Sequence, residues 1–264
     1  MTTPTSNPQP QKAAFIVIGS ELLSGRVHDV NIPVLATALG RHGIDLEEVR
    51  IIPDDRKRIV EAVQDARARY DQVFTGGGIG PTHDDITASS VAEAFGVPLV
   101  LDQESDRKLQ ALSKPGTYNA ARRKMAMLPQ GAKVIENSVS TAPGFSLGNV
   151  HVLAGVPSVF KAMVAWLVPR LPQGAPVRTV GWQANGIQEG DLAQALTEAQ
   201  QRFPTVELGS YPLDRWGKGQ ANTDGAQQPT VALTAKGRDP KALEEASKAL
   251  AIIIRNLAAE PLPL

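Results

Sequence analysis

The sequence predicts an α/β protein: a three-layer sandwich whose mostly parallel sheet lies between two layers of helices, followed by a small α+β domain. Three observations support this expectation. Residues 13–18 form a continuous apolar run, which is typical of a central strand buried on both faces of a parallel sheet. Strand-like and helix-like stretches then alternate through residue 96, and such alternation builds parallel β-α-β units. A stretch rich in proline and glycine, residues 171–176, separates the two parts as a linker.

The first part, residues 13–170, contains most of the predicted elements. Its strands are indicated by short apolar runs, and its helices by apolar residues at helical spacing with glycine at their ends. We expect strands at 13–18, 46–52 and 71–75, alternating with helices at 32–42, 55–69 and 87–96. Residues 102–127 predict two or three short helices, after which strands at 133–136, 144–147 and 150–153 precede a helix at 157–167.

The second part, residues 176–258, predicts a separate domain. Its elements follow the order strand, helix, strand, strand, helix, which is most of a ferredoxin-like pattern. Its final helix carries Ile252, Ile253 and Ile254 in succession, more apolar circumference than one face inside a domain needs, so we expect a homo-oligomer, most simply a dimer. The expected bounds are strands at 177–184, 205–211 and 230–236, helices at 188–202 and 239–257, and a long loop at 214–229.

The composition favours a cytoplasmic protein with a small-molecule ligand. Lys plus Arg and Asp plus Glu both number 27, so the net charge is zero and no general attraction to nucleic acid or to a membrane surface is predicted. The absence of cysteine excludes disulfides, thiolate metal sites and a cysteine nucleophile. Residues 1–12 have no apolar core and are expected to form a disordered tail rather than a signal peptide or an anchor.

Most of the expected chemistry lies in residues 71–90, where a buried strand, a glycine turn, an acidic pair and a helix start follow one another. Gly77, Gly78 and Gly80 let the backbone turn tightly and expose N–H groups, and the helix N-terminus adds partial positive charge. This arrangement predicts a phosphate site, with an ordinary strand-to-helix loop as the alternative. Neither the Walker pattern nor G-x-G-x-x-G is present, which disfavours a kinase or a Rossmann enzyme. Hydroxyl groups would come from Thr82, Thr87 and Ser89.

Two carboxylates follow the glycines and imply a divalent cation. Asp84 and Asp85 would repel a phosphate unless a hard cation such as Mg²⁺ lay between them, and carboxylate oxygens are ligands that Mg²⁺ prefers. The alternative is that Asp85 only caps the helix that starts at Thr87. His28 and His83 lack the spacing of a zinc site and are expected on the surface.

A second polar stretch, residues 19–31, follows the first strand. Because ligand groups gather at the carboxyl ends of parallel strands, this loop should face the glycine turn. Glu21 belongs to it, and its alternative role is to cap the backbone or pair with Arg26. Asp54 lies at the next strand end, and its alternative role is the N-cap of the helix at 55–69.

Several spaced motifs resemble one known family. The run from Gly77 to Thr82 with the following Asp84-Asp85-Ile86-Thr87 resembles the glycine motif of the MoaB/Mog domain, a molybdopterin-binding fold that also occurs in eukaryotic FAD synthases. The stretches GSELLSG at 19–25, TAPGF at 141–145 and GVP at 155–157 look like the amino-terminal half of CinA-type competence/damage-inducible proteins. The resemblance covers about residues 13–168 strongly, and the second domain is similar to the one that follows in CinA-type proteins.

The resemblance implies roles for individual residues. Asp54 and Asp85 match the superfamily's catalytic aspartates, and Glu21, Asp84 and Asp85 are the expected metal ligands. Val159 and Ser140 replace a glutamate and a glycine that are common in CinA proteins, so full CinA activity does not transfer. Without room for the amidase domain that CinA proteins often carry, deamidation is not predicted. The residues expected to contact a pterin or nucleotide are Gly19, Asn31, Gly77, Gly78, Gly80, Thr82, Thr87, Thr141 and Gly144.

These features support three kinds of function. The first is metal-dependent cleavage of a phosphoanhydride, as in hydrolysis of ADP-ribose or a dinucleotide, and the same parts would serve adenylyl transfer to molybdopterin. The second is a non-catalytic module that binds molybdopterin or a nucleotide. The third is a scaffold with a vestigial pocket, which the intact acidic pair disfavours. The expected cofactor is Mg²⁺ or another divalent cation.

Overall fold

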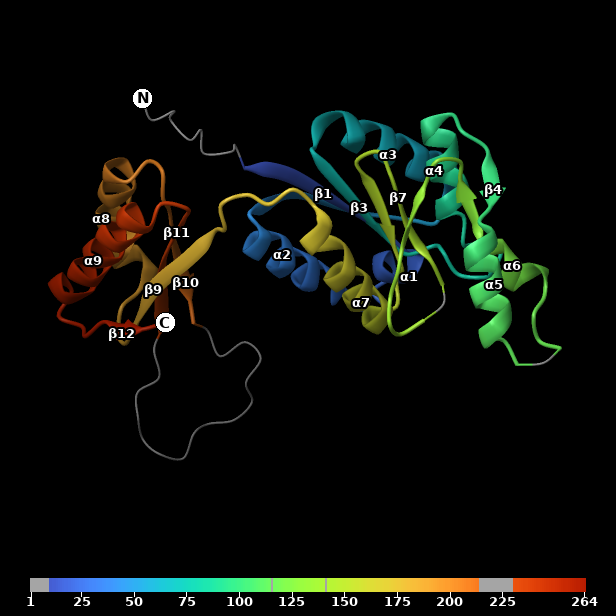
Figure 1. Cartoon of the computed structure of the whole chain (residues 1–264). Helices are drawn as coiled ribbons and strands as arrows, with labels where there is room; N and C mark the ends of the chain where they lie inside the picture. Colours follow the sequence, from blue (N-terminus) through green and yellow to red (C-terminus); the bar gives the residue numbers. More distant parts are fainter. Residues whose placement is uncertain (1–9, 115, 141, 214–229) are drawn as a thin grey trace, which may run out of the picture. The chain divides into compact units, whose positions relative to one another are not determined.

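A computed structural model describes residues 10–114, 116–140, 142–213 and 230–264 of a chain that divides into two compact units, Met1–Ala175 (unit 1) and Pro176–Leu264 (unit 2). Figure 1 shows both units, each with its own sheet and helices. The predicted loop at 214–229 and Thr141 lie outside the described residues. So do residues 1–9 of the predicted tail, whereas Gln11 and Lys12 belong to the first strand, so that part of the tail prediction is wrong.

Unit 1 is built on a six-stranded sheet with the order β2-β1-β3-β8-β7-β6. The first four strands in that order are parallel to one another, and β7 pairs antiparallel with both β8 and β6, which confirms the predicted mostly parallel sheet. The carboxyl ends of the parallel strands therefore meet at one edge, called here the carboxyl edge. The strands are β1 (Gln11–Ile18), β2 (Ile44–Ile52), β3 (Gln72–Gly76), β8 (Val150–Leu153), β7 (Gly144–Leu147) and β6 (Lys133–Ile135).

Helices cover both faces of this sheet, as a three-layer sandwich requires (Figure 1). On one face, Phe15 and Val17 of β1 pack in a core cluster with residues of α2 (Asn31–His42) and α7 (Pro157–Leu167). On the other face, Ala14 and Ile16 pack with residues of α3 (Arg56–Arg69) and α4 (Thr87–Phe95). Successive side chains of a strand point to opposite faces, so the unbroken apolar run supplies both cores.

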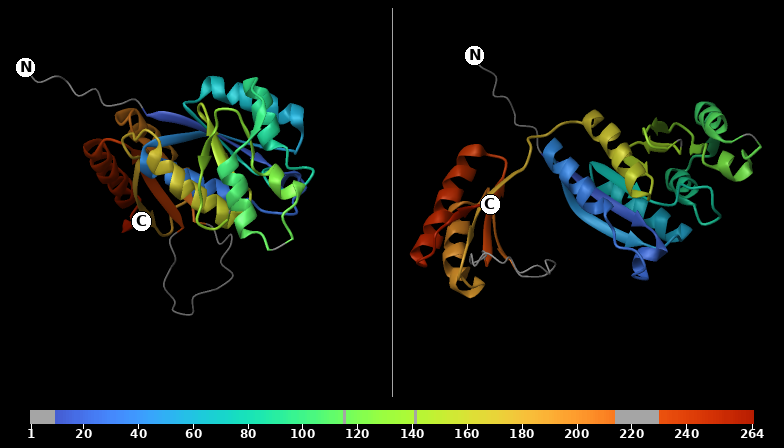
Figure 2. Two further views of the ribbon diagram at one scale, coloured as in Figure 1. Left: turned by 45° about the vertical axis from the view of Figure 1, so that its right-hand side comes forward. Right: turned by 90° about the horizontal axis from the view of Figure 1, so that it is seen from below.

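A small two-stranded sheet between β4 (Leu99–Leu101) and β5 (Met127–Pro129) was not predicted. It closes a segment that contains α5 (Gln103–Leu112) and α6 (Ala120–Lys124), and Figure 2 shows this green segment at one end of unit 1. The helices predicted within 102–127 are confirmed, but their end at residue 127 is wrong because Met127 already pairs with Leu101. A short helix, α1 (Ser20–Leu23), also stands in the loop after β1.

The stretch predicted as a linker is docked onto α2. Gly174 N–H donates to His42 O at 3.0 Å, and His42 Nε2 lies 2.9 Å from Leu171 O. Gly43, which ends α2 with a positive φ of 86°, has no room for a side chain, because an added Cβ would lie 2.3 Å from the Gly174 carbonyl carbon. The stretch follows α7 through a short 3₁₀ helix, Val168–Arg170.

Unit 2 has the ferredoxin-like arrangement that the sequence predicts. Its sheet order, β10-β11-β9-β12, is antiparallel throughout and places the first and third long strands side by side at the centre. Ile253 and Ile254 are buried in its core and Ile252 is 54% exposed, so one of the three isoleucines remains available to an interface, and the homo-oligomer stays a prediction. The elements are β9 (Arg178–Ala184), α8 (Glu189–Arg202), β10 (Glu207–Pro212), β11 (Val231–Gly237), α9 (Pro240–Asn256) and β12 (Leu262–Pro263).

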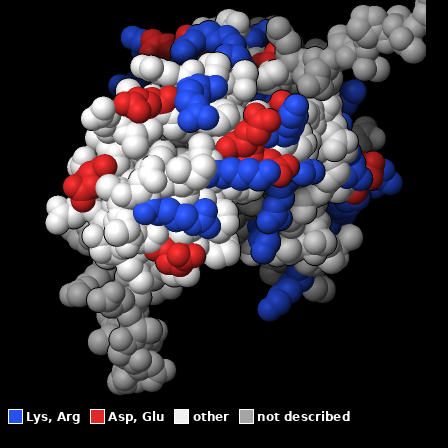
Figure 3. Space-filling model, turned by 90° about the vertical axis from the view of Figure 1, so that its left-hand side faces the viewer, with Lys and Arg blue, Asp and Glu red and all other residues white. Residues whose placement is uncertain are grey.

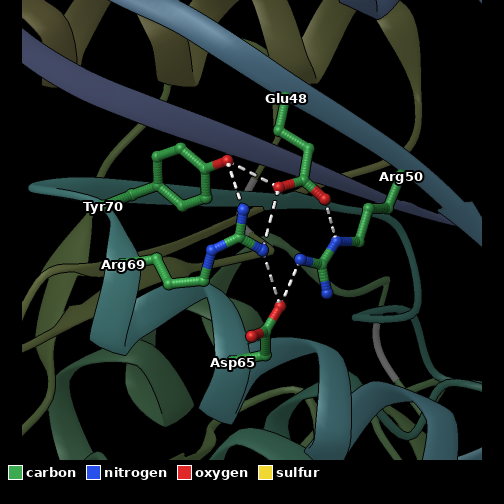
Figure 4. A network of polar contacts seen from close by, with 5 residues as sticks. All are labelled: Glu48, Arg50, Asp65, Arg69 and Tyr70. Atoms are coloured by element: carbon green, nitrogen blue, oxygen red, sulfur yellow. Dashed lines mark hydrogen bonds and ion pairs between the residues drawn. The ribbon is translucent and has the colours of Figure 1, made fainter.

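A polar network fastens the edge strand β2 to α3 (Figure 4). The guanidinium of Arg50 contacts the carboxylates of Glu48 and Asp65, and Arg69 contacts the same two carboxylates at 3.4 and 3.1 Å. The Tyr70 hydroxyl donates to Glu48 Oε2 at 2.6 Å. Hydrogen bonds from Arg50 and then Tyr70 lower the pKa of Glu48, so the carboxylate stays ionised within the network.

A buried histidine connects three strands of unit 1. His151 on β8 is 4% exposed, and its Nε2 lies 2.8 Å from Gln72 Oε1 on β3. Its Nδ1 lies 2.8 Å from the Ser146 hydroxyl on β7, and its ring stacks at a tilt 5.1 Å from Phe74. Burial lowers the pKa of His151 from 6.5 to about 4, because the charged imidazolium loses its hydration there.

The surface carries both signs of charge. Lys and Arg side chains intermingle with Asp and Glu on the face drawn in Figure 3, in keeping with the balanced composition. Unit 2 contributes cross-strand and helical ion pairs, such as Lys236 with Glu207 at 3.0 Å. Among the described residues, every helix is too short or too polar to cross a membrane.

Candidate functional site

The turn after β3 can be made only by glycine. Gly77 and Gly78 have φ values of 109° and 68°, in the region that side chains disfavour. A Cβ on Gly77 would lie 2.2 Å from Ile18 O, so the turn passes directly over the end of β1. Gly155 approaches from β8, since a Cβ added there would lie 3.2 Å from the Gly77 Cα. Three strand ends therefore meet closely at the carboxyl edge.

Thr87 stabilises this turn through two hydrogen bonds. Its hydroxyl donates to Gly77 O at 2.9 Å, and its N–H donates to Gly78 O at 3.0 Å. The side chain is fully buried, and a Cβ on Gly78 would lie 2.2 Å from its Oγ1. Thr87 supports the glycine turn and has no exposed surface for a ligand, so the structure corrects its expected role as a ligand contact.

The acidic residues after the turn are joined through one threonine. Thr82 N–H donates to Asp85 Oδ2 at 2.8 Å, and the Thr82 hydroxyl lies 2.6 Å from Asp84 Oδ1 and also within reach of Asp85 Oδ2. We call Thr82, Asp84 and Asp85 the acidic turn. The Thr82 hydroxyl, followed by a backbone N–H, lowers the pKa of Asp84, which favours its ionised form.

Asp85 is not a helix cap. The N-cap of α4 is Ile86, which makes no side-chain cap hydrogen bond, and the Asp85 carboxylate is turned back toward Gly80 instead. A Cβ on Gly80 would lie 2.7 Å from Asp85 Oδ2, so this glycine provides the space that the carboxylate occupies. The capping alternative for Asp85 is therefore wrong.

Lys124, which the sequence reasoning missed, lies beside the acidic turn. Its Nζ donates to Thr82 O at 2.7 Å from the end of α6. Lys124 and Asp85 are the charged residues among the described lining of a narrow pocket of about 40 Å³, together with Gly78 and Gly80. The run Arg122-Arg123-Lys124 was the only signal in the sequence, and its 42-residue distance from Thr82 gave no indication of contact.

A second group of polar residues lies at the ends of β1 and β2. The Asp54 carboxylate accepts from Ser20 N–H at 2.9 Å and from the Ser20 hydroxyl at 3.0 Å. The neighbouring Asp55 is the N-cap of α3, where it accepts from Arg58 N–H at 2.9 Å, so the capping alternative for Asp54 is also wrong. β1 alone separates β2 from β3, so Asp54 starts about 10 Å from the glycine turn at the usual strand spacing.

Glu21 and Gly19 lie together in this second group. A Cβ on Gly19 would lie 2.7 Å from Glu21 Oε1, so the carboxylate folds over the end of β1. Among the residues that the structure describes, however, no three His, Asp or Glu side chains are grouped closely enough to hold a metal ion. The predicted set of Glu21, Asp84 and Asp85 is therefore not assembled: the two aspartates lie together and Glu21 stands apart.

Asn31 is buried and incompletely satisfied. Its Nδ2 donates to Gly155 O at 2.9 Å, while its Oδ1 is buried without a hydrogen-bond partner. A buried acceptor without a partner is costly, so a donor from a ligand or a water molecule would be favoured there. Through Gly155, Asn31 also fixes the loop that touches Gly77.

Gly144 serves packing rather than binding. It is buried at the start of β7, and a Cβ there would lie 2.7 Å from Val152 O and 3.0 Å from Met163 Sδ. This corrects its expected contact with a ligand. The residues that the structure brings to the carboxyl edge are Gly19, Glu21, Asn31, Asp54, Gly77, Gly78, Gly80, Thr82, Asp84 and Asp85.

Comparison with known families agrees with the division into two units. Residues 14–173 match the family described as "Probable molybdopterin binding domain", and residues 185–258 match "FAD synthase, middle domain". Both matches fall within the corresponding units of the structure. A solved structure titled as the protein CinA with unknown function from Thermoplasma acidophilum is 31% identical and covers 59% of this chain and 94% of that one, with a TM-score of 0.56.

Further relatives match 75% to 78% of this chain. A protein from Archaeoglobus fulgidus is 36% identical over 75% of this chain and 84% of its own length. A CinA-like protein from Citrifermentans bemidjiense is 34% identical, and a probable FAD synthase from Caenorhabditis elegans is 32% identical. The match spans 50% and 44% of those two longer proteins. The chain therefore belongs to the family of molybdopterin-binding domain proteins of the MoaB/Mog type, in its CinA-like branch.

Proposed function

We propose that unit 1 hydrolyses the phosphoanhydride bond of a nucleotide diphosphate compound, such as ADP-ribose or a dinucleotide, with the help of a divalent cation. The observation that carries this proposal is the acidic turn, in which two carboxylates converge through Thr82 beside a glycine turn and an ammonium group. Neither carboxylate is used to cap a helix, so both are available for binding chemistry.

The donor set fits a hard cation. Asp84 and Asp85 present carboxylate oxygens, and Mg²⁺ in proteins is commonly bound by one or two carboxylates together with substrate phosphates and waters. A site of this kind does not need the third carboxylate that the structure leaves apart. When bound, the cation would supply neutralisation of the phosphate charge and polarisation of the phosphoryl group.

The protein's own groups would position the substrate. Gly78 and Gly80 line the narrow pocket, so their backbone N–H groups would be near a phosphate bound there, and Lys124 adds a positive charge to the same pocket. In hydrolysis, water adds to phosphorus, the bridging P–O bond breaks, and the proton of the water passes to a carboxylate. Asp54 is the proposed proton acceptor for a phosphoryl group that extends from the glycine turn toward the end of β2, because Asp54 starts about 10 Å from that turn.

The test is turnover of ADP-ribose with Mg²⁺, Mn²⁺ or Co²⁺ by the wild type and by Asp85→Asn. Asparagine keeps the shape but removes the charge, so we expect kcat/KM to fall on the order of 10²-fold or more while the melting temperature stays near that of the wild type. The matched control is Asp55→Asn, because asparagine caps a helix almost as well as aspartate. An Asp85→Asn protein with wild-type turnover would contradict the proposal.

Adenylyl transfer to molybdopterin is the second candidate, favoured by the family match over residues 14–173. The pterin phosphate would then replace water as the nucleophile, and the same acidic turn would bind the nucleotide phosphates. Product analysis with ATP and molybdopterin separates the two reactions, since transfer yields an adenylylated pterin and hydrolysis yields two phosphate monoesters from ADP-ribose. Binding of these compounds without any product would identify a non-catalytic module.

A further inference from the structure

A pocket much larger than the narrow one lies on the other side of Pro143. It has a volume of about 620 Å³, within the usual range for small-molecule sites, and lies between α5 and the loop that joins β6 to β7. Pro143 lines this pocket and also the narrow pocket that contains Asp85 and Lys124. We call the larger cavity the ring pocket, and it plays no part in the hydrolysis described above.

The ring pocket is suited to an uncharged group. Its described charged residues, Lys108 and Glu136, neutralise one another at 2.7 Å, and Lys108 also pairs with Glu104 at 2.8 Å. The rest of its wall is mainly apolar and includes Leu112 and Val139, which are 74% and 56% exposed although both are large aliphatic side chains. Burying such surfaces against an apolar ring is favourable, whereas a phosphate would find no unpaired cation there.

Hydrogen bonds of Asn137 brace part of the pocket wall. Asn137 Oδ1 accepts from Val139 N–H at 3.1 Å and from Ser140 N–H at 2.6 Å. Asn137 Nδ2 donates to Ala142 O at 3.1 Å, so one side chain contacts the backbone of residues 139, 140 and 142. A preformed wall reduces the ordering cost of binding.

The two pockets differ in the size of the group that each can accommodate. At about 40 Å³, the narrow pocket has room for roughly three water-sized groups, which suits a phosphoryl group and is too small for a heteroaromatic ring. A ring attached to the phosphate must therefore lie elsewhere, and the ring pocket adjoins across a single residue.

We propose that the ring pocket binds the heteroaromatic ring of the substrate, while the phosphate next to that ring lies across Pro143 at the acidic turn. This assignment rests on the proposed function for the position of the phosphate. It restricts the substrates to compounds that join a nucleobase or pterin ring to a phosphate, and it excludes ring-free phosphoanhydrides such as inorganic pyrophosphate as good ligands. Nucleobase and pterin share the required chemistry, and separate probes distinguish them.

The test uses the full chain and introduces a large side chain on α5 that would fill the ring pocket. Ala111 lines the ring pocket and Gln110, the preceding residue, does not, and both are exposed. Calorimetric titration with ADP, adenosine, neopterin and inorganic pyrophosphate in the presence of Mg²⁺ is compared for the wild type, Ala111→Trp and the matched control Gln110→Trp. Val139→Asp is a second variant at an exposed position, and it places a charge in the apolar wall.

We expect the wild type to bind ADP at least tenfold more tightly than pyrophosphate, and Ala111→Trp and Val139→Asp to lose that advantage while Gln110→Trp keeps it. Adenosine or neopterin, whichever binds more tightly, identifies the ring. Equal affinities for ADP and pyrophosphate, unchanged ADP binding in both pocket variants, or no binding of any ring compound would overturn the assignment. If the expected binding pattern holds while Asp85→Asn turns over normally, the proposed hydrolysis fails and the ring pocket stands.

Discussion

His151 should make unit 1 less stable at mildly acidic pH. Because Gln72 Oε1 can only accept, the neutral ring carries its proton on Nε2, and Nδ1 accepts from the Ser146 hydroxyl. A second proton would have to enter on Nδ1, in a site where burial removes the water that would stabilise the charge. The native protein therefore resists this proton, whereas the unfolded chain does not.

The pKa of His151 gives the sign and size of the effect. Its value falls from 6.5 to about 4 on folding, so between these values the unfolded chain binds a proton that the native protein does not. The stability contributed by keeping the ring neutral is fully present above pH 6.5, declines as the pH falls to 4, and then levels off. At 1.36 kcal/mol for each pKa unit, the decline amounts to about 3 kcal/mol in the free energy of unfolding.

Urea unfolding between pH 4 and pH 7, followed through amide resonances of β3 and β8, measures this decline. The comparison is with His151→Gln, because groups that titrate in both proteins cancel in the difference. We expect the stability advantage of the wild type over the variant to grow by about 3 kcal/mol from pH 4 to pH 7. His83→Gln is the control, since its side chain is 98% exposed. A difference that stays flat, or a His151 ring that titrates near pH 6.5 in NMR spectra, would refute the reasoning.

Three further predictions concern the fold. Gly77→Ala should lower the free energy of unfolding by roughly 3 kcal/mol or more, because it combines backbone strain with a clash. Gly96→Ala has open space around its Cβ and should lower it by about 1 kcal/mol. Thermal melts that show equal losses for the two variants would contradict the geometry. Arg50→Met should lower the free energy of unfolding in urea by about 1 kcal/mol, and this loss should shrink in 1 M NaCl. The control is Lys57→Met, which removes an exposed ion pair and should hardly change the urea midpoint. The fragment 10–175 should unfold cooperatively on its own, and a broad, non-cooperative calorimetric transition would show that the unit boundary is misplaced.

The sequence predicts the parallel sheet well because the pattern that defines it is local. The run at residues 13–18 is apolar at every position, and the structure shows why: alternate side chains enter the cores on opposite faces. The pair β4 and β5 could not be found in this way. Each strand has three residues, too few for a periodic pattern, and their pairing joins Leu101 to Met127 across the whole helical segment.

The candidate site was predictable where its residues are neighbours in the chain. Thr82, Asp84 and Asp85 contact one another within a single turn, so their residue types alone indicate shared chemistry. Thr87 has the same residue type as Thr82, yet it is buried beneath the glycine turn, and only the path of the backbone decides between the two roles. Lys124 reaches the site because α6 packs beside it, and no local sequence pattern predicts that contact.

The contact between Gly43 and Gly174 restricts how this chain can change over evolutionary time. An added side chain at either position would meet the backbone of the other, at 2.3 Å from one side and 2.5 Å from the other. A partner substitution cannot relieve the clash, because both positions already have the smallest residue. The two glycines should therefore be retained together, or lost together when the segment after α7 takes another path, and an insertion between residues 171 and 174 should release both positions at once.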